Sequence, residues 1–259
     1  MQDKQKQGKI LVTGAARRIG AALVAALASD GWEVVLHYNN RRQEAEALCA
    51  SLTDKGYKVT AISADLSLAD APDALMAAAS HSGPVTAVIN NASLFSYDCA
   101  DSVTPELIAR HMAVNLSAPT MLTKALYQQL PEEMPEGMTG CVINMLDAKL
   151  FGINPDYFSY TLSKAAAHSL TQISAQAYAP RLRVNAIAPG IVLPSGEQSQ
   201  AEFEKSHKRN LLGQGATIAE IVAAMRLLLS ASSMTGEVVI LDGGAHLRPP
   251  ARDVAFLEA

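Results

Sequence analysis

The chain has 259 residues and a formal net charge of −4, and 49% of its residues are hydrophobic against 18% charged. This composition can fill one large globular core and excludes disorder, while the lack of a basic stripe argues against nucleic acid as a partner. The three cysteines are widely spaced and no segment has the apolar length of a signal peptide or membrane span, so we expect a cytoplasmic protein with no metal site and no membrane contact.

Short β-branched segments alternate with longer amphipathic segments, a pattern typical of a parallel sheet with helical crossovers. The fold class we predict is α/β, with one Rossmann-type domain over residues 1–259: a doubly wound parallel sheet of about seven strands and helices on both faces. The predicted strands are Ile10–Thr13, Glu33–His37, Lys58–Ser63, Val85–Asn90, Cys141–Met145, Arg183–Ala188 and Val238–Leu241. The predicted helices are Arg18–Asp30, Arg41–Lys55, Ala71–Ser80, Pro105–Gln129, Asp156–Ala179 and Thr217–Ser230.

Two segments interrupt the alternation. Pro131–Gly140 has the composition of a long surface turn before the fifth predicted strand. Ile191–Ala216 is long and polar, and it follows a strand end, where sheets of this type bind ligands. We therefore expect residues 191–216 to form a lid over the substrate.

The first predicted strand is joined to the first helix by Thr13-Gly14-Ala15-Ala16-Arg17-Arg18-Ile19-Gly20. Small residues there let the backbone approach a pyrophosphate, whose charge would meet the free N–H groups at the helix start. Arg17 and Arg18 carry the wrong sign for that end of a helix, which costs roughly 0.3–1 kcal/mol for each unpartnered charge. Because an anionic ligand would remove this cost, a dinucleotide site is favoured over a purely structural turn.

The second predicted strand runs into His37-Tyr38-Asn39-Asn40-Arg41-Arg42, with no carboxylate before Glu44. Proteins that prefer NAD usually place a carboxylate here for the ribose 2′-hydroxyl. Arg17, Arg41 and Arg42 can instead make charge-assisted bonds to a 2′-phosphate. Arg41 and Arg42 alternatively do no more than begin an exposed helix. We predict NADPH as the cofactor.

Tyr160 and Lys164 are four residues apart, and Asp147 lies thirteen residues before the tyrosine. On a helix the tyrosine and lysine share a face, so the ammonium should favour the ionised phenol and move its pKa from about 10 towards neutrality. A phenol in this position can give a proton to a substrate atom that receives a hydride. Asp147 follows a buried strand, where a charged carboxylate is costly unless it has a partner or a function. With the glycine turn, these residues predict an oxidoreductase.

With these motifs, the chain resembles the short-chain dehydrogenase/reductase family over nearly its whole length. The resemblance rests on segments that occur in the family's order, namely Thr13-Gly14…Gly20, Ala64-Asp65-Leu66, Asn90-Asn91-Ala92-Ser93, Val114-Asn115, Tyr160…Lys164, Ala188-Pro189-Gly190 and Leu241-Asp242-Gly243-Gly244. It implies a homotetramer or homodimer.

The resemblance implies roles for single residues. It places Asp65 beside the adenine and Lys164 at the nicotinamide ribose, lets Asn90 support the cofactor site, and has Asn115 kink its helix around a proton-relay water. The predicted cofactor contacts are Thr13, Gly14, Arg17, Arg18, Ile19, Gly20, His37, Asn39, Asn40, Arg41, Asp65, Leu66, Asn91, Ala92, Ser93, Lys164, Pro189, Gly190 and Ile191.

Two positions depart from the common family pattern: Arg18 replaces a glycine, and Asp147 replaces the usual catalytic serine. Both changes resemble the pteridine reductase subfamily, and the ending from Leu241 to Arg248 is similar to that of dihydromonapterin reductases. The likeness implies that Phe95 stacks on a pterin lying against the nicotinamide, that Ser93 bonds pterin and cofactor phosphate, and that Arg18 reaches towards both. Taken alone, Phe95 is equally well a loop anchor and Ser93 a turn residue.

We therefore expect an NADPH-dependent reduction of a small pteridine substrate, either biopterin, dihydromonapterin or a dihydrofolate-like compound. The alternatives are a broad NADPH-dependent ketone or 3-oxoacyl reductase and, in another class, a non-catalytic NADPH-sensing protein. The predicted catalytic residues are Asp147, Tyr160, Lys164 and Asn115, and the predicted substrate contacts are Arg18, Ser93, Phe95, Asp147 and Tyr160.

Overall fold

The computed structural model describes residues 8–134, 139–194 and 198–256. Within these ranges the strands form one parallel sheet in the order β3-β2-β1-β4-β5-β6-β7, which confirms the predicted doubly wound α/β class. The strands are β1 Lys9–Val12, β2 Glu33–Tyr38, β3 Val59–Ser63, β4 Val85–Asn90, β5 Gly140–Met145, β6 Leu182–Pro189 and β7 Val238–Leu241.

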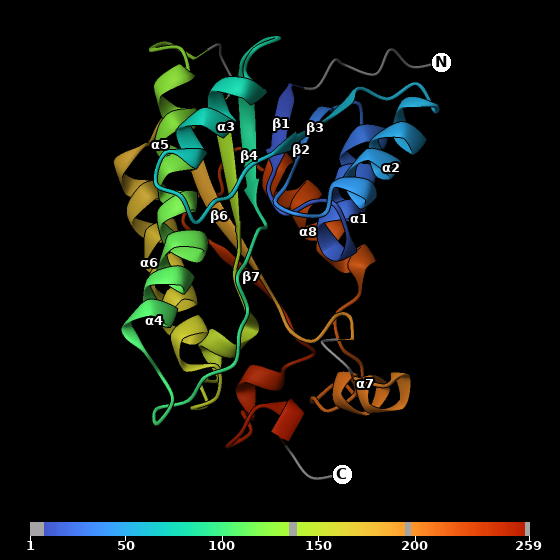
Figure 1. The fold of residues 1–259 in the computed structure, drawn as a ribbon, viewed down its shortest axis with the longest axis vertical. Coiled ribbons are helices and arrows are strands. Elements are labelled where there is room, and N and C mark those ends of the chain that lie inside the picture. The colour runs from blue at the N-terminus through green and yellow to red at the C-terminus, as the bar shows by residue number, and fades with distance from the viewer. Residues whose placement is uncertain (1–7, 135–138, 195–197, 257–259) are drawn as a thin grey trace.

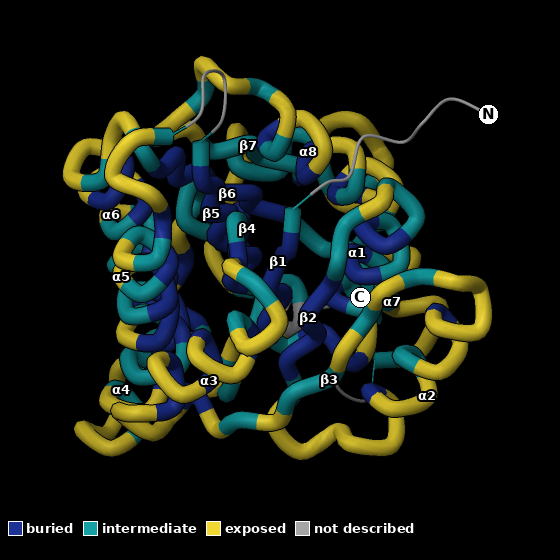
Figure 2. Tube along the Cα trace, turned by 90° about the horizontal axis from the view of Figure 1, so that it is seen from above, coloured by how far each residue is buried: buried dark blue, intermediate teal, exposed yellow. Residues whose placement is uncertain are grey.

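Helices cover both faces of this sheet (Figure 1). Alternate side chains of β1 point to opposite faces, so Ile10 and Val12 join one apolar cluster and Leu11 joins the other. Both faces are covered, and the inner strands β1, β2, β4, β5 and β6 are accordingly deeply buried, whereas the edge strands β3 and β7 are only partly buried (Figure 2). One layer contains α1 Arg18–Ser29, α2 Arg42–Thr53 and α8 Ile218–Ser230, and the other contains α3 Ala71–Ala79, α4 Pro105–Met112, α5 Ala118–Gln129 and α6 Phe158–Ala177.

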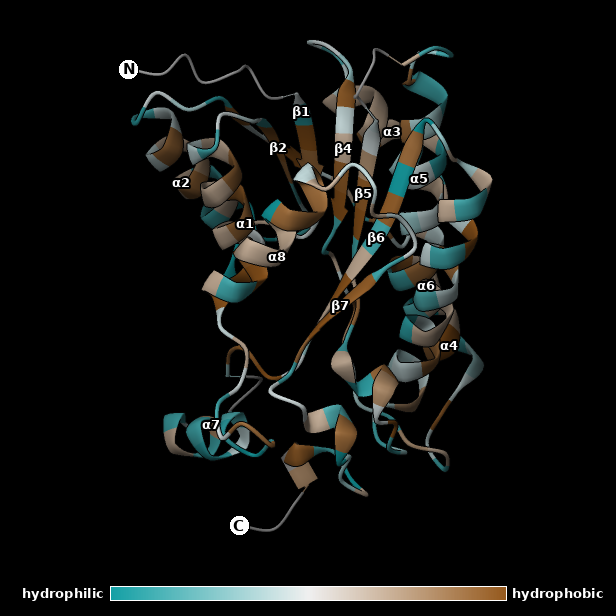
Figure 3. Ribbon diagram, turned by 180° about the vertical axis from the view of Figure 1, so that it is seen from behind, coloured by the Kyte–Doolittle hydropathy of each residue, from teal (hydrophilic) through white to brown (hydrophobic). Residues whose placement is uncertain are grey.

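The strand order reverses direction at β1. Val12 pairs with Leu36 of β2 on one side and with Ile89 of β4 on the other, so the segments that follow these strands meet at one edge of the sheet. Ligands of open α/β sheets bind at such a carboxyl edge. Helix α7 (Gln200–His207) and the C-terminal segment lie beyond the ends of β6 and β7, away from the packed layers, as Figure 3 also shows.

The predicted helix ends differ from the structure by up to two residues, and two of the predicted helices differ for a clear structural reason. The helix predicted over Pro105–Gln129 is divided by a π-helical segment, Ala113–Ser117, which contains the buried Asn115; the kink expected at Asn115 stays a prediction. The helix predicted to begin at Asp156 begins at Phe158, because Tyr157 has a φ of 54°, in the left-handed region that a helix cannot continue through.

The segment predicted as a lid contains an unpredicted helix, α7. Its start has a reciprocal cap, in which Ser199 accepts from the backbone of Glu202 and the Glu202 carboxylate accepts from Ser199. Residues 195–197 of this segment and 135–138 of the predicted surface turn lie outside the described residues. Among the residues that the structure describes, no helix is long and apolar enough to cross a membrane, and no group of three potential ligands could hold a metal ion.

Candidate active site

The glycine-rich turn after β1 packs tightly against the end of β4. Gly14 has a φ of 61°, and a Cβ at this position would lie 2.7 Å from the Cα of Ala92. A Cβ on Gly20 would lie 2.6 Å from the carbonyl oxygen of Gly14. Real Cβ atoms do not tolerate such distances, so both positions require glycine, and the turn keeps its backbone open to a ligand at the start of α1.

Side chains from the two neighbouring strands brace this turn. Asn91 Nδ2 donates to the carbonyl oxygens of Thr13 and Gly14, at 2.9 Å each. The backbone N–H of Gly14 donates to Nδ1 of His37 (3.1 Å), so His37 is neutral and its Nε2 donates to the carbonyl of Ala64 (3.0 Å). Burial lowers the pKa of His37, which favours this neutral form. Both side chains thus hydrogen-bond to the backbone of the protein. The sequence predicted them as cofactor contacts and did not predict that they hold this turn.

Two exposed arginines stand at the start of α1, whose first turn contains no acidic residue. Arg18 has a φ of 55°, which explains why glycine is common at this position in the family turn. Its Nη1 donates to the carbonyl of Pro194 (2.7 Å), and partial burial and the charge of Arg17 lower the pKa of Arg18. Glycine backbone, helix dipole and paired cations make this place suited to a pyrophosphate.

The arginines after β2 differ in their partners. Arg42 Nε lies 2.7 Å from Glu46 Oε1 one helical turn away, which supports the interpretation of this residue as part of the helix surface. Arg41 Nη1 is 3.6 Å from Glu44 Oε1, a longer and weaker pairing. Asn39 and Asn40 are exposed beside it. Arg41 is therefore the better placed of the two to meet a 2′-phosphate.

The remaining predicted cofactor residues lie along the same edge. Asp65 is exposed after β3, and the backbone N–H and hydroxyl of Ser67 donate to its carboxylate, which lowers the pKa of Asp65. Gly190, after β6, donates its N–H to the carbonyl of Leu241 (2.7 Å), and a Cβ there would lie 2.9 Å from the Cβ of Asp242. Of the other residues predicted there, Leu66, Ala92, Pro189 and Ile191 lie at or just after the ends of β3, β4 and β6, and Ile19 lies in the first turn of α1.

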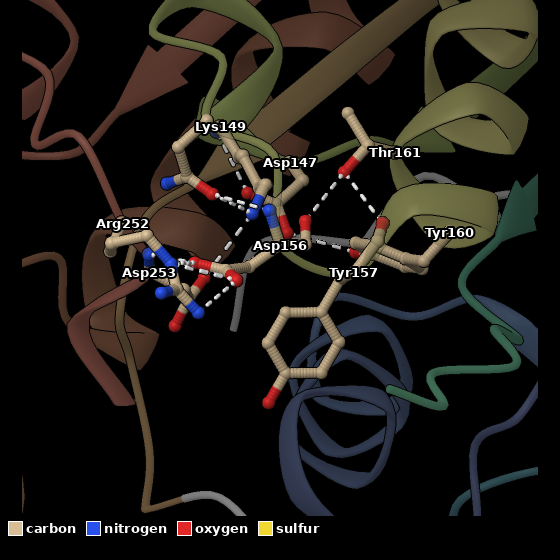
Figure 4. A network of polar contacts seen from close by, with 9 residues as sticks. Asp147, Lys149, Asp156, Tyr157, Tyr160, Thr161, Arg252 and Asp253 are labelled. Atoms are coloured by element: carbon tan, nitrogen blue, oxygen red, sulfur yellow. Dashed lines mark hydrogen bonds and ion pairs between the residues drawn. The ribbon is translucent and has the colours of Figure 1, made fainter. Parts of the chain in front are cut away.

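The proton-bearing groups meet just past the end of β5. Tyr160 Oη donates to Asp147 Oδ2 at 2.8 Å, and the other carboxylate oxygen of Asp147 accepts the backbone N–H of Lys149 at 2.8 Å (Figure 4). The ammonium of Lys164 donates to the carbonyl of Met145 (2.7 Å) and lies 5.7 Å from the centroid of the Tyr160 ring. The sequence-predicted trio is therefore assembled in one place.

The predicted direction of the tyrosine shift is wrong for this arrangement. Burial, followed by the charge and hydrogen bond of Asp147, raises the pKa of Tyr160 well above its ordinary range. Burial lowers the pKa of Lys164 to about 8, against the opposing attraction of Asp147. The sequence spacing correctly placed Lys164 near the phenol of Tyr160, but the group hydrogen-bonded to that phenol is the carboxylate of Asp147. The phenol consequently keeps its proton and holds it towards Asp147.

An aromatic cluster lies over Tyr160. The Phe95 ring is stacked on Tyr157, with centroids 4.3 Å apart and planes 18° apart, and meets Tyr160 edge to face at 4.7 Å. Phe95 nevertheless stays 49% exposed, so a flat ring can reach the side of Phe95 that Tyr157 does not cover. Tyr157 was absent from the sequence-predicted site, and the left-handed backbone that aims its ring has no local sequence marker.

Asn115 holds the loop that carries Ser93 and Phe95. Its Oδ1 accepts from the backbone of Leu94 (2.8 Å) and the hydroxyl of Ser93 (3.3 Å). Its Nδ2 donates to the Leu94 carbonyl (3.0 Å) and to Ser163 Oγ (2.9 Å). The side chain is engaged on both ends, so its structural role is to fix this loop against α6, and the predicted water relay stays a prediction.

Two further buried residues belong to this region and were missed. Asp98 accepts from the backbone N–H (3.0 Å) and the hydroxyl of Ser159, which satisfies a donor at the start of α6. His111 accepts the N–H of Ser96 (3.3 Å) through Nε2, and its ring centroid lies 6.3 Å from that of Tyr160. Partners so far apart in sequence leave no motif, and only the tertiary fold brings them together.

Comparisons with known proteins agree with this geometry. The family model described as enoyl-(acyl carrier protein) reductase matches residues 14–246. The chain is 31% identical to 3beta-hydroxysteroid dehydrogenase 1 of Eggerthella lenta, covering 96% of this chain and 97% of the relative. It is 28% identical to pteridine reductase 1 of Leishmania tarentolae, covering 92% and 96%.

A solved structure gives the same fold at higher identity. FolM alternative dihydrofolate reductase 1 from Brucella canis, complexed with NADP, superposes with a TM-score of 0.88 at 38% identity, covering 96% of this chain and 97% of that one. The chain therefore belongs to the short-chain dehydrogenase/reductase family of oxidoreductases, and pteridine reductases are among its relatives. The resemblance predicted from the sequence motifs is confirmed.

Proposed function

We propose that this protein is an NADPH-dependent reductase of a pteridine. The observation that carries the proposal is the hydrogen bond from Tyr160 to Asp147 directly beside the half-exposed ring of Phe95. A carboxylate bonded to a phenol can share a proton with a ring nitrogen, whereas the serine more usual in the family suits a ketone oxygen. The aromatic ring next to it suits a flat heterocycle.

The protein's residues fit the proposed cofactor. Gly14 and Gly20 admit the pyrophosphate at the start of α1, and Arg17 supplies a cation there. Arg41 is exposed and its ion pair to Glu44 is long, so its guanidinium can meet a 2′-phosphate. Lys164 would hold the nicotinamide ribose, as the family resemblance implies. When bound, NADPH supplies a hydride.

The protein's part of the reaction is proton delivery. Reduction of a C=N bond adds a hydride to carbon and a proton to nitrogen, and the proton comes from the Tyr160–Asp147 unit. Because the phenol is buried and its pKa is raised, it holds its proton until a basic ring nitrogen approaches. Phe95 would orient the ring, and the family resemblance implies that Arg18, which donates to the carbonyl of Pro194, reaches towards the pterin.

The test is a substrate panel with the purified protein. NADPH oxidation would be followed by absorbance with biopterin, dihydrobiopterin, dihydromonapterin and dihydrofolate, and in parallel with 3-oxoacyl and steroid ketones. We expect kcat/KM to be at least tenfold higher for one of the pterins than for any ketone. Ketones as the better substrates would overturn the proposal in favour of a broad ketone reductase. Tight NADPH binding without any turnover would instead indicate the sensing protein.

A further inference from the structure

The last described residues of the chain lie against the candidate active site. We call residues 252–256 the C-terminal clasp. They contact the segment before α6, which carries Tyr160, and the turn after β5, which begins with Asp147 (Figure 4). The sequence predicted no role for this part of the chain.

The first contact is a fork-to-fork ion pair. Arg252 Nε lies 2.8 and 3.0 Å from the two oxygens of Asp156, and its Nη2 lies 2.7 Å from Oδ1. The backbone N–H of Asp253 adds a fourth bond to the same carboxylate (2.7 Å). Asp156 is only 2% exposed, and Arg252 lowers its pKa, so the carboxylate is charged, buried and matched. It stands four residues before Tyr160.

The second contact reaches the other half of the proton-delivery unit. Asp253 Oδ2 lies 3.4 Å from Lys149 Nζ, and the backbone N–H of Lys149 is a hydrogen-bond donor to Asp147. Lys149 Nζ also donates to Asn154, in the loop that leads to Asp156. Two consecutive clasp residues, Arg252 and Asp253, therefore connect Asp156, four residues before Tyr160, with Lys149, whose backbone holds Asp147.

The third contact is aromatic. The Phe256 ring lies 4.8 Å from Tyr97 and 6.2 Å from Tyr157, and the guanidinium of Arg252 lies 5.3 Å from the Phe256 centroid. Tyr157 is itself stacked on Phe95. Phe256 is thus the outer member of the aromatic cluster that begins at Tyr160, and it stays 41% exposed on the outward side.

We infer that the clasp is part of the substrate site: Arg252, through Asp156, and Asp253, through Lys149, position the Asp147–Tyr160 pair, and Phe256 limits the size of the substituent that a substrate can carry. The inference rests on the proposed function in one respect, that the substrate ring lies at Phe95. A carboxylate–guanidinium fork fixes both distance and orientation, which a flexible tail packed only by apolar contact would not do.

The chain contains a matched control for the ion pair. Arg226 makes a fork with Asp30 at 2.7 and 2.9 Å, and its exposed fraction of 51% is close to the 49% of Arg252. That pair joins α8 to the end of α1 and touches none of the residues assigned to the reaction. Arg226→Ala therefore reports the loss of a fork of similar geometry, on a more exposed carboxylate (30% for Asp30 against 2% for Asp156), without loss of the clasp.

The kinetic experiment compares Arg252→Ala, Arg252→Lys and Arg226→Ala. For Arg252→Ala we expect kcat to fall about tenfold and substrate KM to rise severalfold, with an unchanged NADPH Kd measured by nicotinamide fluorescence. Arg252→Lys should recover part of the loss, because lysine keeps the charge and loses the fork. Equal kinetics for Arg252→Ala and Arg226→Ala would overturn the positioning role.

Size selection is tested with Phe256→Ala. The ratio of kcat/KM for dihydrofolate, which has a long substituent, to kcat/KM for dihydrobiopterin should rise at least fivefold. An unchanged ratio would overturn the assignment of Phe256. If the unaltered protein reduces no pterin, the proposed function fails, and ketones of graded size then test the clasp on the substrates that the protein does accept.

A third measurement does not depend on activity. Trypsin can cleave after Arg252, but the fork to Asp156 should protect this bond. Asp156→Asn should release residues 253–259 at least tenfold faster, as followed by mass spectrometry, whereas Asp30→Asn should not. Equal release rates for the two variants would show that the clasp is not held, and the inference would be withdrawn.

Discussion

The phenol of Tyr160 donates its hydrogen bond to Oδ2 of Asp147 across 2.8 Å, thirteen residues back along the chain. This pairing makes two side chains behave as one unit. Tyr160→Phe should lower kcat for pterin reduction by about 10²–10⁴ and leave NADPH binding intact. Asp147→Asn should also lower pterin turnover, and the double variant should be little worse than Tyr160→Phe. Single-turnover rates would measure this; losses that multiply would show independent roles. Asp147→Ser is the matched control, because any residual ketone reduction should survive it better than pterin reduction.

Titration of Lys164 should make both kcat/KM and the stability of the protein depend on pH. Its folded-state pKa of about 8 lies below the ordinary 10.5, so the ammonium is lost as pH rises through 8. We expect kcat/KM to fall by about tenfold per pH unit above that value. Stability should change in the opposite sense: between pH 8 and 10.5 the unfolded chain binds more protons than the folded one, so the free energy of unfolding rises with pH. Lys164→Arg keeps its charge and should remove the basic limb; the same limb in that variant would assign it to another group.

Phe95 tests the stacking. Phe95→Ala should raise the pterin KM by a factor that corresponds to roughly 1–2 kcal/mol, while the NADPH Kd changes little. Phe95→Leu is the control, since it keeps apolar bulk against Tyr157 but removes the aromatic face. An unchanged KM in both variants would leave Phe95 as a loop anchor.

Arg41 and Arg42 form a natural pair of test positions. The unaltered protein should prefer NADPH over NADH at least tenfold, because charge-assisted contacts to a phosphate contribute about 1.5–3 kcal/mol. Arg41→Ala should reduce this preference. Arg42→Ala should leave it nearly unchanged, because Arg42 is already paired with Glu46. Competition binding with NADPH and NADH measures this preference. Equal affinity of the unaltered protein for the two nucleotides would contradict the assignment of Arg41 to the 2′-phosphate.

The Arg18→Gly variant tests whether Arg18 serves ligand binding or the stability of the fold. Its φ of 55° costs a non-glycine residue about 1 kcal/mol, so Arg18→Gly should leave Tm unchanged or slightly higher. The same change removes the bond to Pro194 and should raise the KM of both cofactor and pterin. A clear drop in Tm with normal kinetics would mean that the arginine serves the fold.

The sequence predicted most of what local patterns encode. β-branched segments separated by amphipathic ones are enough to predict the sheet, and a four-residue spacing is enough to bring Lys164 near Tyr160. It could not predict contacts that join distant segments: Arg252 and Asp156 are 96 residues apart and neither belongs to a motif. The shift of the Tyr160 pKa was missed for the same reason, since burial and the hydrogen bond to Asp147 exist only in the folded chain.

The chain enters the sheet at Lys9, at the edge opposite the candidate site, whereas its last described residues pack beside Asp156 and Tyr157. A product that stops before residue 252 would keep every strand and every long helix but lack the support next to α6. During synthesis, the proposed site is therefore completed only after residue 256 has left the ribosome. For the same reason, a tag fused just after the clasp would lie beside the candidate active site, whereas a tag placed before Lys9 would lie at the opposite edge of the sheet.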